Sequence, residues 1–387
     1  MSVDYLGTLA ASNGLVREVR VIPPDGDVDL LWTVAVDLEC SAAKAGDGQR
    51  GDRMDMSWVG AAGFRRGPTY VRAAGEAVER ASLEPSIALL PGDGLPLARP
   101  GSLWRDWHPT GPTYRAVRVG GGGTEPVAVP AGAVDFPPMS GKEQLDAFDP
   151  GPSGTAAWTN HAGAAGSAAR ELIERDAVMC AWYDPARARR ITDTRPLGEE
   201  FGRLAEKARR VGVALHLVDA PGRRPGVLLC LAVDVARGVV GAGISLERTP
   251  AQTALKAAQE ALQIRALLIR LKASERPLPL ELPLTSERDR ARFWCAPGAV
   301  EVAGRWLDQV PATEHVIVAD ARMAAWPDAV GEHVVVDLTP RLPGPIRAMG
   351  WCAVKMFAPE LQPLRMSEAH AWNVLEPPVF DSPHPFV

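Results

Sequence analysis

The chain has 387 residues, a formal net charge of -5, and a composition that is 46% hydrophobic and 23% charged. This is the profile of a soluble globular protein, and it excludes a disordered chain. The acidic balance, without any block of Lys and Arg, argues against nucleic acid or an anionic membrane as the main partner. We therefore expect a peptide or a small molecule as the partner.

The amino terminus lacks a basic region followed by an apolar run, and no segment reaches the roughly 18 apolar residues of a membrane span. We therefore predict a cytoplasmic protein. The five cysteines are scattered and have no C-x-x-C spacing, which argues against a disulfide framework or a cysteine zinc site.

The first quarter of the chain predicts a hairpin and a helix. Residues 14–40 hold two apolar runs divided by a Pro-Pro-Asp-Gly turn, which indicates two paired strands. Residues 41–55 are polar and rich in glycine, as expected of a surface loop. Pro68 and Thr69 then mark the start of a helix that runs to about Leu83.

A second hairpin is predicted around four consecutive glycines, with strands at 114–119 and 127–129. No helix follows the glycines and no Gly-Lys-Ser/Thr ending is present, so we interpret them as a turn and not as a phosphate-binding loop. The small residues of segment 150–166 predict a flexible lead-in, containing Asn160 and His161, to another helix.

The second half of the chain alternates helices and strands, which favours a mixed α/β fold. A helix is predicted at 199–211, strands buried on both faces at 214–218 and 227–233, and a long helix after Thr249 and Pro250. We further expect a helix near 285–308, strands at 315–319 and 332–338, and a proline-rich end that lies extended across the surface or in a groove.

Two of the predicted helices carry the same acidic motif, E-x-x-E-R. The first copy holds Glu76, Glu79 and Arg80, and the second holds the residues Glu171, Glu174 and Arg175. Glutamates three residues apart share one face of a helix and repel each other. A single copy is most simply an exposed helix face, but two copies suggest that a divalent cation, such as the Mg2+ of a nucleoside triphosphate, offsets the repulsion.

The long third helix repeats part of this pattern, because Glu260 and Gln263 again share a face and Arg265 follows. Glu, Gln and Arg are good helix formers that often decorate exposed faces. On its own, this third group would not indicate a site.

Taken together and in this order, the motifs resemble the YcaO-domain family, ATP-dependent enzymes that modify backbone amides of peptides. Residues 72–80 resemble the family's first acidic helix, residues 168–177 its second, and residues 256–265 its third. The sequence Pro-Glu-Leu-Gln-Pro-Leu at 359–364 is similar to another family motif, and the tail resembles the family's proline-rich terminus. The resemblance spans about residues 50–387.

The resemblance implies an α/β fold in which ATP lies among acidic helices. It implies one YcaO-like domain over residues 1–387, with a β-hairpin region at 1–50, a core at 51–365 and a tail at 366–387 that reaches toward the active site. The cofactors would be ATP and Mg2+. The implied metal ligands are Glu76, Glu79, Glu171 and Glu174, and the implied nucleotide-binding residues are Arg80, Arg175, Glu260, Gln263 and Arg265.

Three departures from the family pattern stand out. Arg72 replaces a serine at the head of the first motif, and Ala62 stands in the middle of a turn where the family has G-K-G. Arg65 and Arg66 are candidates to supply the missing lysine's charge. The P-x-P-x-P ending appears here as Pro383, His384, Pro385, Phe386 and Val387, and in the family this terminus is thought to order the catalytic site.

The expected reaction is ATP-dependent activation of an amide in a ribosomally made precursor peptide, with cysteine cyclised to a thiazoline. Macroamidine formation by the peptide's own amino terminus and thioamide formation with external sulfide remain alternatives. A catalytically silent scaffold for a partner enzyme is a further one. The substrate is expected to bind unaided or through a separate leader-peptide-binding protein, and a homodimer is left open.

Overall fold

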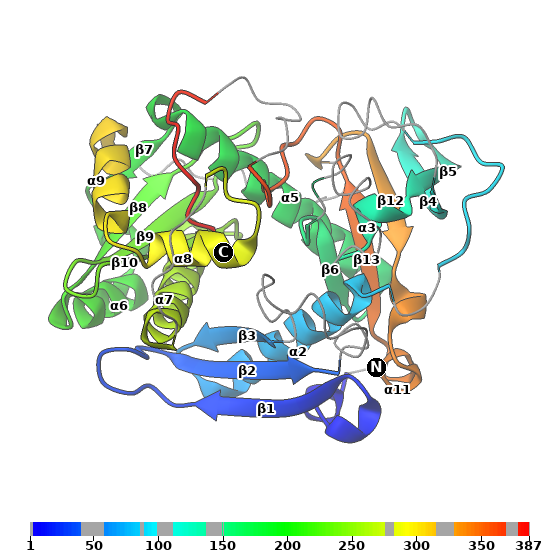
Figure 1. Cartoon of the computed structure of the whole chain (residues 1–387), viewed down its shortest axis with the longest axis horizontal. Coiled ribbons are helices and arrows are strands. Elements are labelled where there is room, and N and C mark those ends of the chain that lie inside the picture. The colour runs from blue at the N-terminus through cyan, green and yellow to red at the C-terminus, as the bar shows by residue number, and fades with distance from the viewer. Residues whose placement is uncertain are drawn as a thin grey trace.

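The computed structural model describes residues 3–39, 58–85, 89–98, 111–136, 149, 151–274, 282–314, 329–368 and 378–386. Its described strands form three sheets, with helices packed between and around them (Figure 1). This arrangement confirms the predicted mixed α/β class. One buried apolar cluster contains residues from Val3 to Phe386 and so joins both ends of the chain to the centre.

The first sheet is antiparallel and contains the predicted hairpin, β1 (Val16–Ile22) and β2 (Trp32–Leu38), with β3 (Trp58–Gly63) on the other side of β2. The loop predicted at 41–55 lies outside the described residues. Helix α2 (Arg66–Leu83) packs against β2 and β3, and confirms the predicted first acidic helix. Short helix α1 (Tyr5–Thr8) precedes the sheet.

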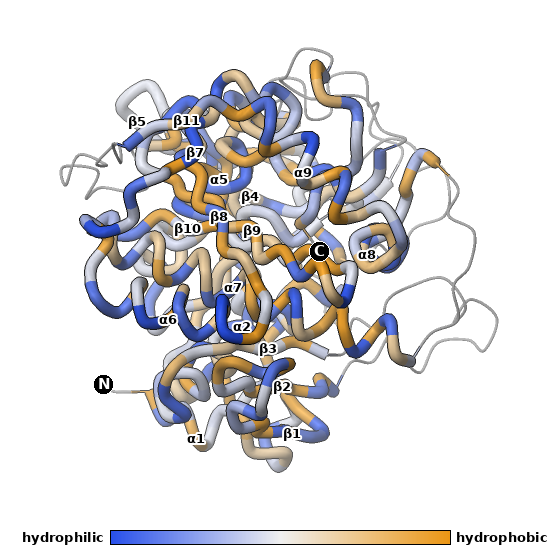
Figure 2. The backbone as a smooth tube through the Cα atoms, turned by 90° about the vertical axis from the view of Figure 1, so that its left-hand side faces the viewer, coloured by the Kyte–Doolittle hydropathy of each residue, from blue (hydrophilic) through white to orange (hydrophobic). Residues whose placement is uncertain are grey.

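The second sheet has the strand order β10-β9-β8-β7-β11. Its strands are β7 (Arg189–Ile191), β8 (Val213–Asp219), β9 (Leu228–Asp234), β10 (Val239–Ser245) and β11 (Ala312–Thr313). Helix α6 (Glu199–Arg210) packs on β8, and the long helix α7 (Pro250–Ser274) packs on β9 and β10. Figure 2 shows that α6 is largely hydrophilic, as its place on the outside requires.

Strand β10 was not predicted, because its glycines hide the pattern of a strand. Gly241 and Gly243 face α7 so closely that an added Cβ would lie 2.2 Å from the carbonyl oxygens of Ala261 and Ala257, respectively. The absence of side chains therefore allows α7 to lie directly on the strand, and the strand is buried along its whole length.

We expect Gly243→Ala to lower the free energy of unfolding by about 1–3 kcal/mol or more, because the new methyl group must push α7 away from β10. The control is Gly202→Ala on the exposed side of α6, where an added Cβ meets no atom within 4 Å. That change should raise stability by about 0.5–1 kcal/mol. Urea denaturation measures both, and equal effects would contradict the close-contact interpretation.

The third sheet has the order β5-β4-β12-β13-β6, and all its neighbouring pairs are antiparallel. Strands β4 (Thr113–Gly120) and β5 (Gly123–Pro130) confirm the predicted glycine-turn hairpin, and β12 (His333–Asp337) confirms the predicted strand at 332–338. Strands β6 (Thr155–Trp158) and β13 (Cys352–Phe357) were not predicted. Short helices α3 (Ala131–Val134) and α11 (Gly344–Ala348) adjoin this sheet in the chain.

Helix α5 (His161–Tyr183) packs against β6 and β13 and carries the second acidic motif. It begins earlier than predicted, and β6 occupies part of the segment that was expected to be flexible. Asn160 caps the helix by accepting a hydrogen bond of 2.8 Å from the backbone N–H of Gly163. A good cap followed by alanines, which are strong helix formers, explains the early start.

The helix predicted near 285–308 is in fact two helices, α8 (Glu287–Trp294) and α9 (Ala299–Gln309). Gly298 separates them with a φ of +99°, a conformation that favours glycine. The strand predicted at 315–319 lies outside the described residues. No helix in the described ranges combines the length and the apolar character that a membrane span needs.

Residues 383–386, near the end of the proline-rich tail, are buried, which fits the prediction that the tail lies in a groove. Trp182 of α5 donates from its indole nitrogen to the carbonyl of Ser382, and Trp294 of α8 donates to that of His384, both at 2.9 Å. Phe386 is 4% exposed. Figure 1 shows this end of the chain beside α8.

Candidate functional site

The acidic motifs lie on α2, α5 and α7, and their charges act on one another. Burial raises the pKa of Glu79 well above its usual range, and the neighbouring charges of Glu76 and Glu171 raise it further. The first and second motifs, about a hundred residues apart in sequence, are therefore close in space. Glu76 itself is exposed, whereas Glu79 and Glu171 are half-buried.

The second and third motifs are linked in the same way. Burial raises the pKa of Glu171 to about 7 and that of Glu260 to about 7, and the charge of Glu174 adds to both shifts. Arg175 opposes these shifts, and its Nε lies 3.3 Å from an oxygen of Glu171. Burial lowers the pKa of Arg175, but the charges of the three glutamates outweigh it and the net shift is upward.

Two of these carboxylates are held by the end of β10. Glu174 accepts a hydrogen bond of 2.7 Å from the backbone N–H of Leu246, and Glu260 accepts one of 2.9 Å from that of Ile244. The N–H groups near the end of one strand therefore fix side chains from α5 and α7. We call Glu79, Glu171, Glu174 and Glu260 the acidic cluster. Strand β10, which the sequence did not predict, therefore positions two of its four carboxylates.

The other residues of the third motif make structural contacts. Gln263 donates to the carbonyl of Gly60 in β3 at 3.0 Å. Arg265 is fully buried and pairs with Asp234 of β9, with Nη2 at 2.6 Å from the carboxylate, and it also donates to the carbonyls of residues 27 and 28. Its guanidinium thus ties α7 to β9 and to the turn between β1 and β2. As nucleotide-binding residues, Gln263 and Arg265 stay predictions.

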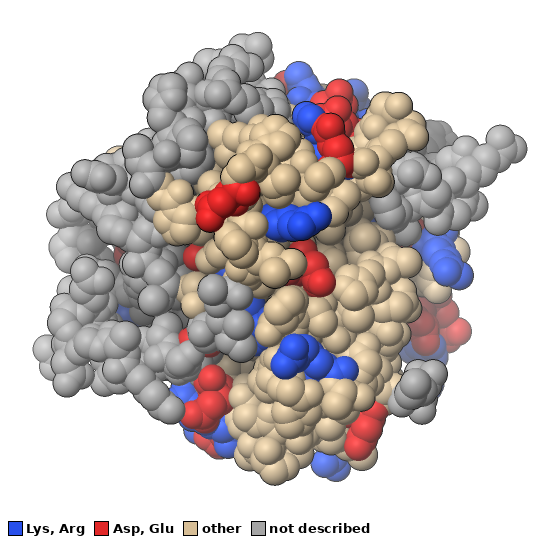
Figure 3. Space-filling model, turned by 90° about the vertical axis from the view of Figure 1, so that its right-hand side faces the viewer, with Lys and Arg blue, Asp and Glu red and all other residues tan. Residues whose placement is uncertain are grey.

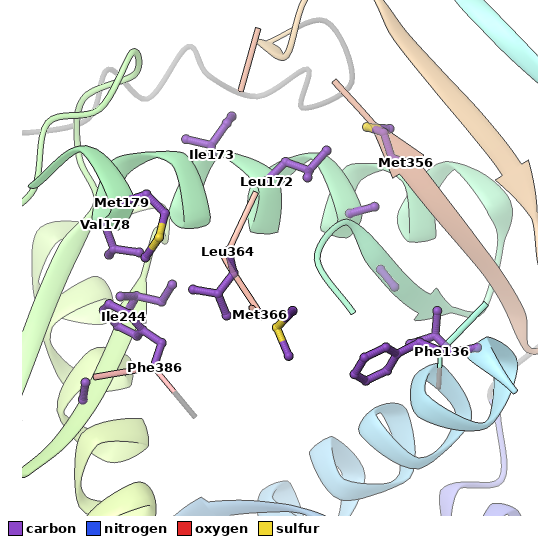
Figure 4. Packing of buried hydrophobic residues seen from close by; sticks show 14 of the residues in the cluster. Phe136, Leu172, Ile173, Val178, Met179, Ile244, Met356, Leu364, Met366 and Phe386 are labelled. Carbon is purple, nitrogen blue, oxygen red and sulfur yellow. The ribbon is translucent and has the colours of Figure 1, made fainter. Parts of the chain in front are cut away.

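Arg80 has no ion-pair partner among the described residues, and its guanidinium lies over the ring of Phe136, 5.9 Å from the centroid. Figure 4 shows Phe136, Leu364 and Met366 on the side of α5 where α2 and α7 also lie. Apolar side chains from late in the chain therefore adjoin the acidic helices. This leaves Arg80 as a cation available beside Glu79.

Two of the departures from the family pattern meet in the structure. A guanidinium nitrogen of Arg72 donates to the carbonyl of Ala62, and another donates to Gln259 at 3.3 Å. Burial lowers the pKa of Arg72, and the charges of Glu76 and Glu260 oppose this. Arg72 thus brings a positive charge to the altered turn, whereas the candidates Arg65 and Arg66 are exposed.

Sequence reasoning missed Asp176, which directly follows the second motif. Its buried carboxylate accepts hydrogen bonds from the backbone N–H groups of Gln362, at 2.9 Å, and Arg223, at 3.1 Å. It therefore ties the segment around Gln362 to α5. The only sequence signal was its position next to Arg175.

The tail also approaches the cluster. Burial lowers the pKa of His384 well below its usual range, and Arg175 is among the charges that lower it further. Pro383 and Pro385 flank this histidine and are buried, whereas Val387 lies outside the described residues. The roles of Pro383, Pro385 and Val387 in ordering the site stay predictions.

The donor set fits Mg2+ in kind, because this ion takes oxygen ligands and commonly uses one or two carboxylates together with phosphate and water. Burial favours the protonated form of these carboxylates, and bound cations would keep them ionised. Among the described residues, no three acidic, histidine or cysteine side chains are close enough to hold one ion together. The assignment of Glu76, Glu79, Glu171 and Glu174 as metal ligands therefore stays a prediction.

The raised pKa of Glu171 predicts a pH-dependent effect of Glu171→Gln. The pKa of Glu171 is about 7 in the folded protein and lower in the unfolded chain, so the folded state holds a proton that the unfolded state releases at lower pH. As the pH rises toward 7 this proton is lost, and the free energy of unfolding of the wild type falls. The neutral variant avoids this loss. Its melting temperature should therefore exceed that of the wild type by more at pH 8 than at pH 5.5, as scanning calorimetry can measure. A pH-independent difference would contradict the raised pKa.

The protein has an α/β fold with a charged site among three helices. Comparison with known proteins identifies its class. The family model described as YcaO cyclodehydratase, ATP- and Mg2+-binding, matches residues 103–362. The chain belongs to the YcaO family. It is therefore an ATP-dependent enzyme of the peptide-modifying kind, with ATP and Mg2+ as cofactors. The match includes α5 and α7 but begins after α2, so Glu76 and Glu79 lie outside it.

Solved structures share the fold at low sequence identity. The YcaO protein of Methanopyrus kandleri, bound with AMPPCP and Mg2+, is 20% identical with a TM-score of 0.65, over 96% of this chain and 93% of that one. A heterocyclase in complex with substrate and cofactor is 16% identical with a TM-score of 0.65, over 93% and 51%. A chain of the E. coli microcin synthetase McbBCD complex is 14% identical with a TM-score of 0.63, over 89% of this chain and 88% of that one. No curated protein matches the chain at a significant level.

Proposed function

We propose that this protein uses ATP and Mg2+ to activate a backbone amide of a ribosomally made precursor peptide, and that the product is a thiazoline formed from cysteine. The thiol attacks the amide carbon, the amide oxygen is phosphorylated by ATP, and phosphate leaves as the C=N bond forms. Phosphorylation makes the oxygen a good leaving group. The products are the ring, ADP and phosphate.

The observation that carries the proposal is a group of four partly or fully buried carboxylates from three helices, Glu79, Glu171, Glu174 and Glu260. The charge of Glu171 raises the pKa of Glu79, and the charge of Glu174 raises the pKa values of Glu171 and Glu260. A folded protein gains no stability from bringing such groups together without a counter-charge. The Mg2+ that accompanies a nucleoside triphosphate supplies a counter-charge of this kind. The family membership and the solved YcaO structure with a nucleotide analogue and Mg2+ support the same assignment.

In this proposal, different side chains of the site bind Mg2+, keep the carboxylates in place and contact phosphate. The glutamates of α2 and α5 would hold Mg2+, which neutralises phosphate charge during transfer. Glu174 and Glu260 are positioned by the end of β10, so the geometry of their carboxylates is set before the nucleotide binds. Arg175 would keep the neighbouring carboxylates ionised, and Arg80 is placed to contact phosphate oxygens.

A peptide partner also agrees with the charge distribution. Figure 3 shows one face of the molecule, on which positive and negative side chains are interspersed and do not form a single-sign field. Nucleic acids are bound through extended basic surfaces. The heterocyclase and microcin synthetase structures are described with substrate or with partner subunits, so a separate peptide-binding protein remains part of the proposal for this chain.

Phosphate release with Mg-ATP and candidate precursor peptides tests the proposal, with any partner protein supplied. We expect ATP turnover that depends on peptide, and a product that has lost one water with its cysteine consumed, as shown by mass spectrometry after alkylation. Loss of water with a free cysteine retained would indicate a macroamidine, and exchange of oxygen for sulfur a thioamide. Folded protein that releases no phosphate with any precursor would favour the silent scaffold.

A further inference from the structure

Lys355 of β13 is a buried cation that the site described above does not use. Its side chain is 2% exposed, and its ammonium donates to the carbonyl of Gly151 at 2.5 Å. No carboxylate of a described residue lies within ion-pair distance of it. A lysine placed this way keeps unused donor capacity, because an ammonium has three N–H groups.

A second unused polar group lies next to it. Thr155 of β6 is the direct cross-strand partner of Lys355, so the two side chains project from the same face of the sheet. Thr155 is fully buried, and its hydroxyl has no hydrogen-bond partner among the described residues. Buried hydroxyls are normally hydrogen-bonded, so this pair of donors calls for a ligand.

The surroundings connect this pair with the acidic cluster. Burial lowers the pKa of Lys355 to about 8, whereas the charges of Glu171 and Asp135 favour its ammonium form and those of Arg341 and Arg80 oppose it. Asp135 is already engaged, because it pairs with Arg341 at 2.5 Å and accepts from the hydroxyl of Tyr114 at 3.1 Å. Arg175 is paired with Glu171. Among the described residues, Lys355 and Arg80 are therefore the cations near Glu79 and Glu171 that have no ion-pair partner, which makes this side of the cluster suited to an anion.

A contribution to stability does not explain why a lysine is buried at position 355. Burial of an ammonium without a carboxylate partner is unfavourable, and well-packed apolar residues often replace buried charges at no cost. Unfavourable buried charges are typical of functional positions. The neighbouring ring of Phe357, with its centroid 5.7 Å from Nζ, offsets only part of the loss of hydration.

We propose that Lys355 and Thr155 form a binding subsite for phosphoryl oxygens on the sheet side of the acidic cluster. The inference rests on the proposed function for the source of that group, which is either the terminal phosphate of ATP or the phosphoryl group once it is on the peptide. Lys355 supplies a charged donor and Thr155 a neutral one. The acidic helices hold the metal, and this strand pair binds the phosphoryl group from the other side.

The test uses Lys355→Met, which keeps the length of the side chain and removes the charge. Calorimetric titration compares binding of a non-hydrolysable ATP analogue and of ADP, each with Mg2+. We expect affinity for the analogue to fall about tenfold or more, as for loss of a charged hydrogen bond, with ADP binding unchanged. Thr155→Val should give a smaller loss of about threefold. The melting temperature of Lys355→Met should equal or exceed that of the wild type.

Lys207→Met is the matched control, since this lysine of α6 also donates to a backbone carbonyl, that of Leu30 at 2.6 Å. Its nucleotide binding should be unaffected. If Lys355→Met binds both nucleotides normally but loses peptide-dependent phosphate release at least tenfold, the subsite holds the phosphoryl group on the peptide. Normal binding together with normal turnover overturns the inference, as does a fall in melting temperature that accompanies a proportional loss of all binding. The binding experiments need no peptide, so failure to modify any precursor would count against the proposed function alone.

Discussion

Glu79→Gln and Glu174→Gln should each reduce peptide-dependent ATP turnover about 100-fold or more, because in the proposed function each carboxylate holds Mg2+ and so positions phosphate. The fold should survive both changes. The glutamine at 174 can still accept the hydrogen bond from Leu246, and the one at 79 relieves a buried like-charge contact. We therefore expect the Glu79 variant to melt at the same temperature as the wild type or higher.

The matched control for these variants is Glu206→Gln on α6, an exposed carboxylate paired with Arg209 and Arg210. It should retain full turnover, since exposed pairs contribute little. Phosphate release at saturating Mg-ATP, measured on protein with a native melting transition, separates the two groups. Normal turnover in both Glu79→Gln and Glu174→Gln would contradict the acidic site.

Removal of residues 383–387 should abolish turnover and lower the free energy of unfolding by about 3–5 kcal/mol or more. The removed segment carries the buried side chains of His384 and Phe386, and the carbonyl of His384 accepts a hydrogen bond from the indole nitrogen of Trp294. Loss of this segment leaves the indole nitrogen of Trp294 without this acceptor, and the ring of Trp294 packs edge-on against Trp182 with ring centroids 5.5 Å apart. It also removes the histidine that lies near Arg175.

Smaller changes separate stability from activity in the tail. Phe386→Ala should lower stability by about 3–5 kcal/mol, as for other buried aromatic residues. Val379→Ala is the control, because this side chain is 74% exposed and its loss should change stability by about 0.5 kcal/mol or less. Urea denaturation and phosphate release together test the prediction. A stable truncated protein with normal turnover would show that the tail does not order the site.

The sequence predicted the elements with a clear local pattern. The E-x-x-E-R motifs lie in helices because their spacing is helical, and α2, α6 and α7 lie close to their expected bounds. The paired strands around Pro-Gly and glycine turns were equally readable. Local periodicity was sufficient in these cases because each element is amphipathic or bounded by strong turn residues.

The missing elements depend on tertiary contacts. Strand β10 contains glycines whose function is to admit α7, and this requirement is invisible without the helix in place. The pairing of Lys355 with Thr155 joins residues two hundred positions apart, and only the strand register reveals it. The roles of Asp176 and Arg265 depend in the same way on partners that are distant in sequence.

The most direct test of the account is a structure of the protein with Mg2+ and a non-hydrolysable ATP analogue. We predict a magnesium ion at about 2.0–2.1 Å from a carboxylate oxygen of Glu76 or Glu79 and one of Glu171 or Glu174, with the triphosphate between α2, α5 and α7. A nucleotide bound elsewhere on the protein, with these glutamates free of metal, would contradict the central claim.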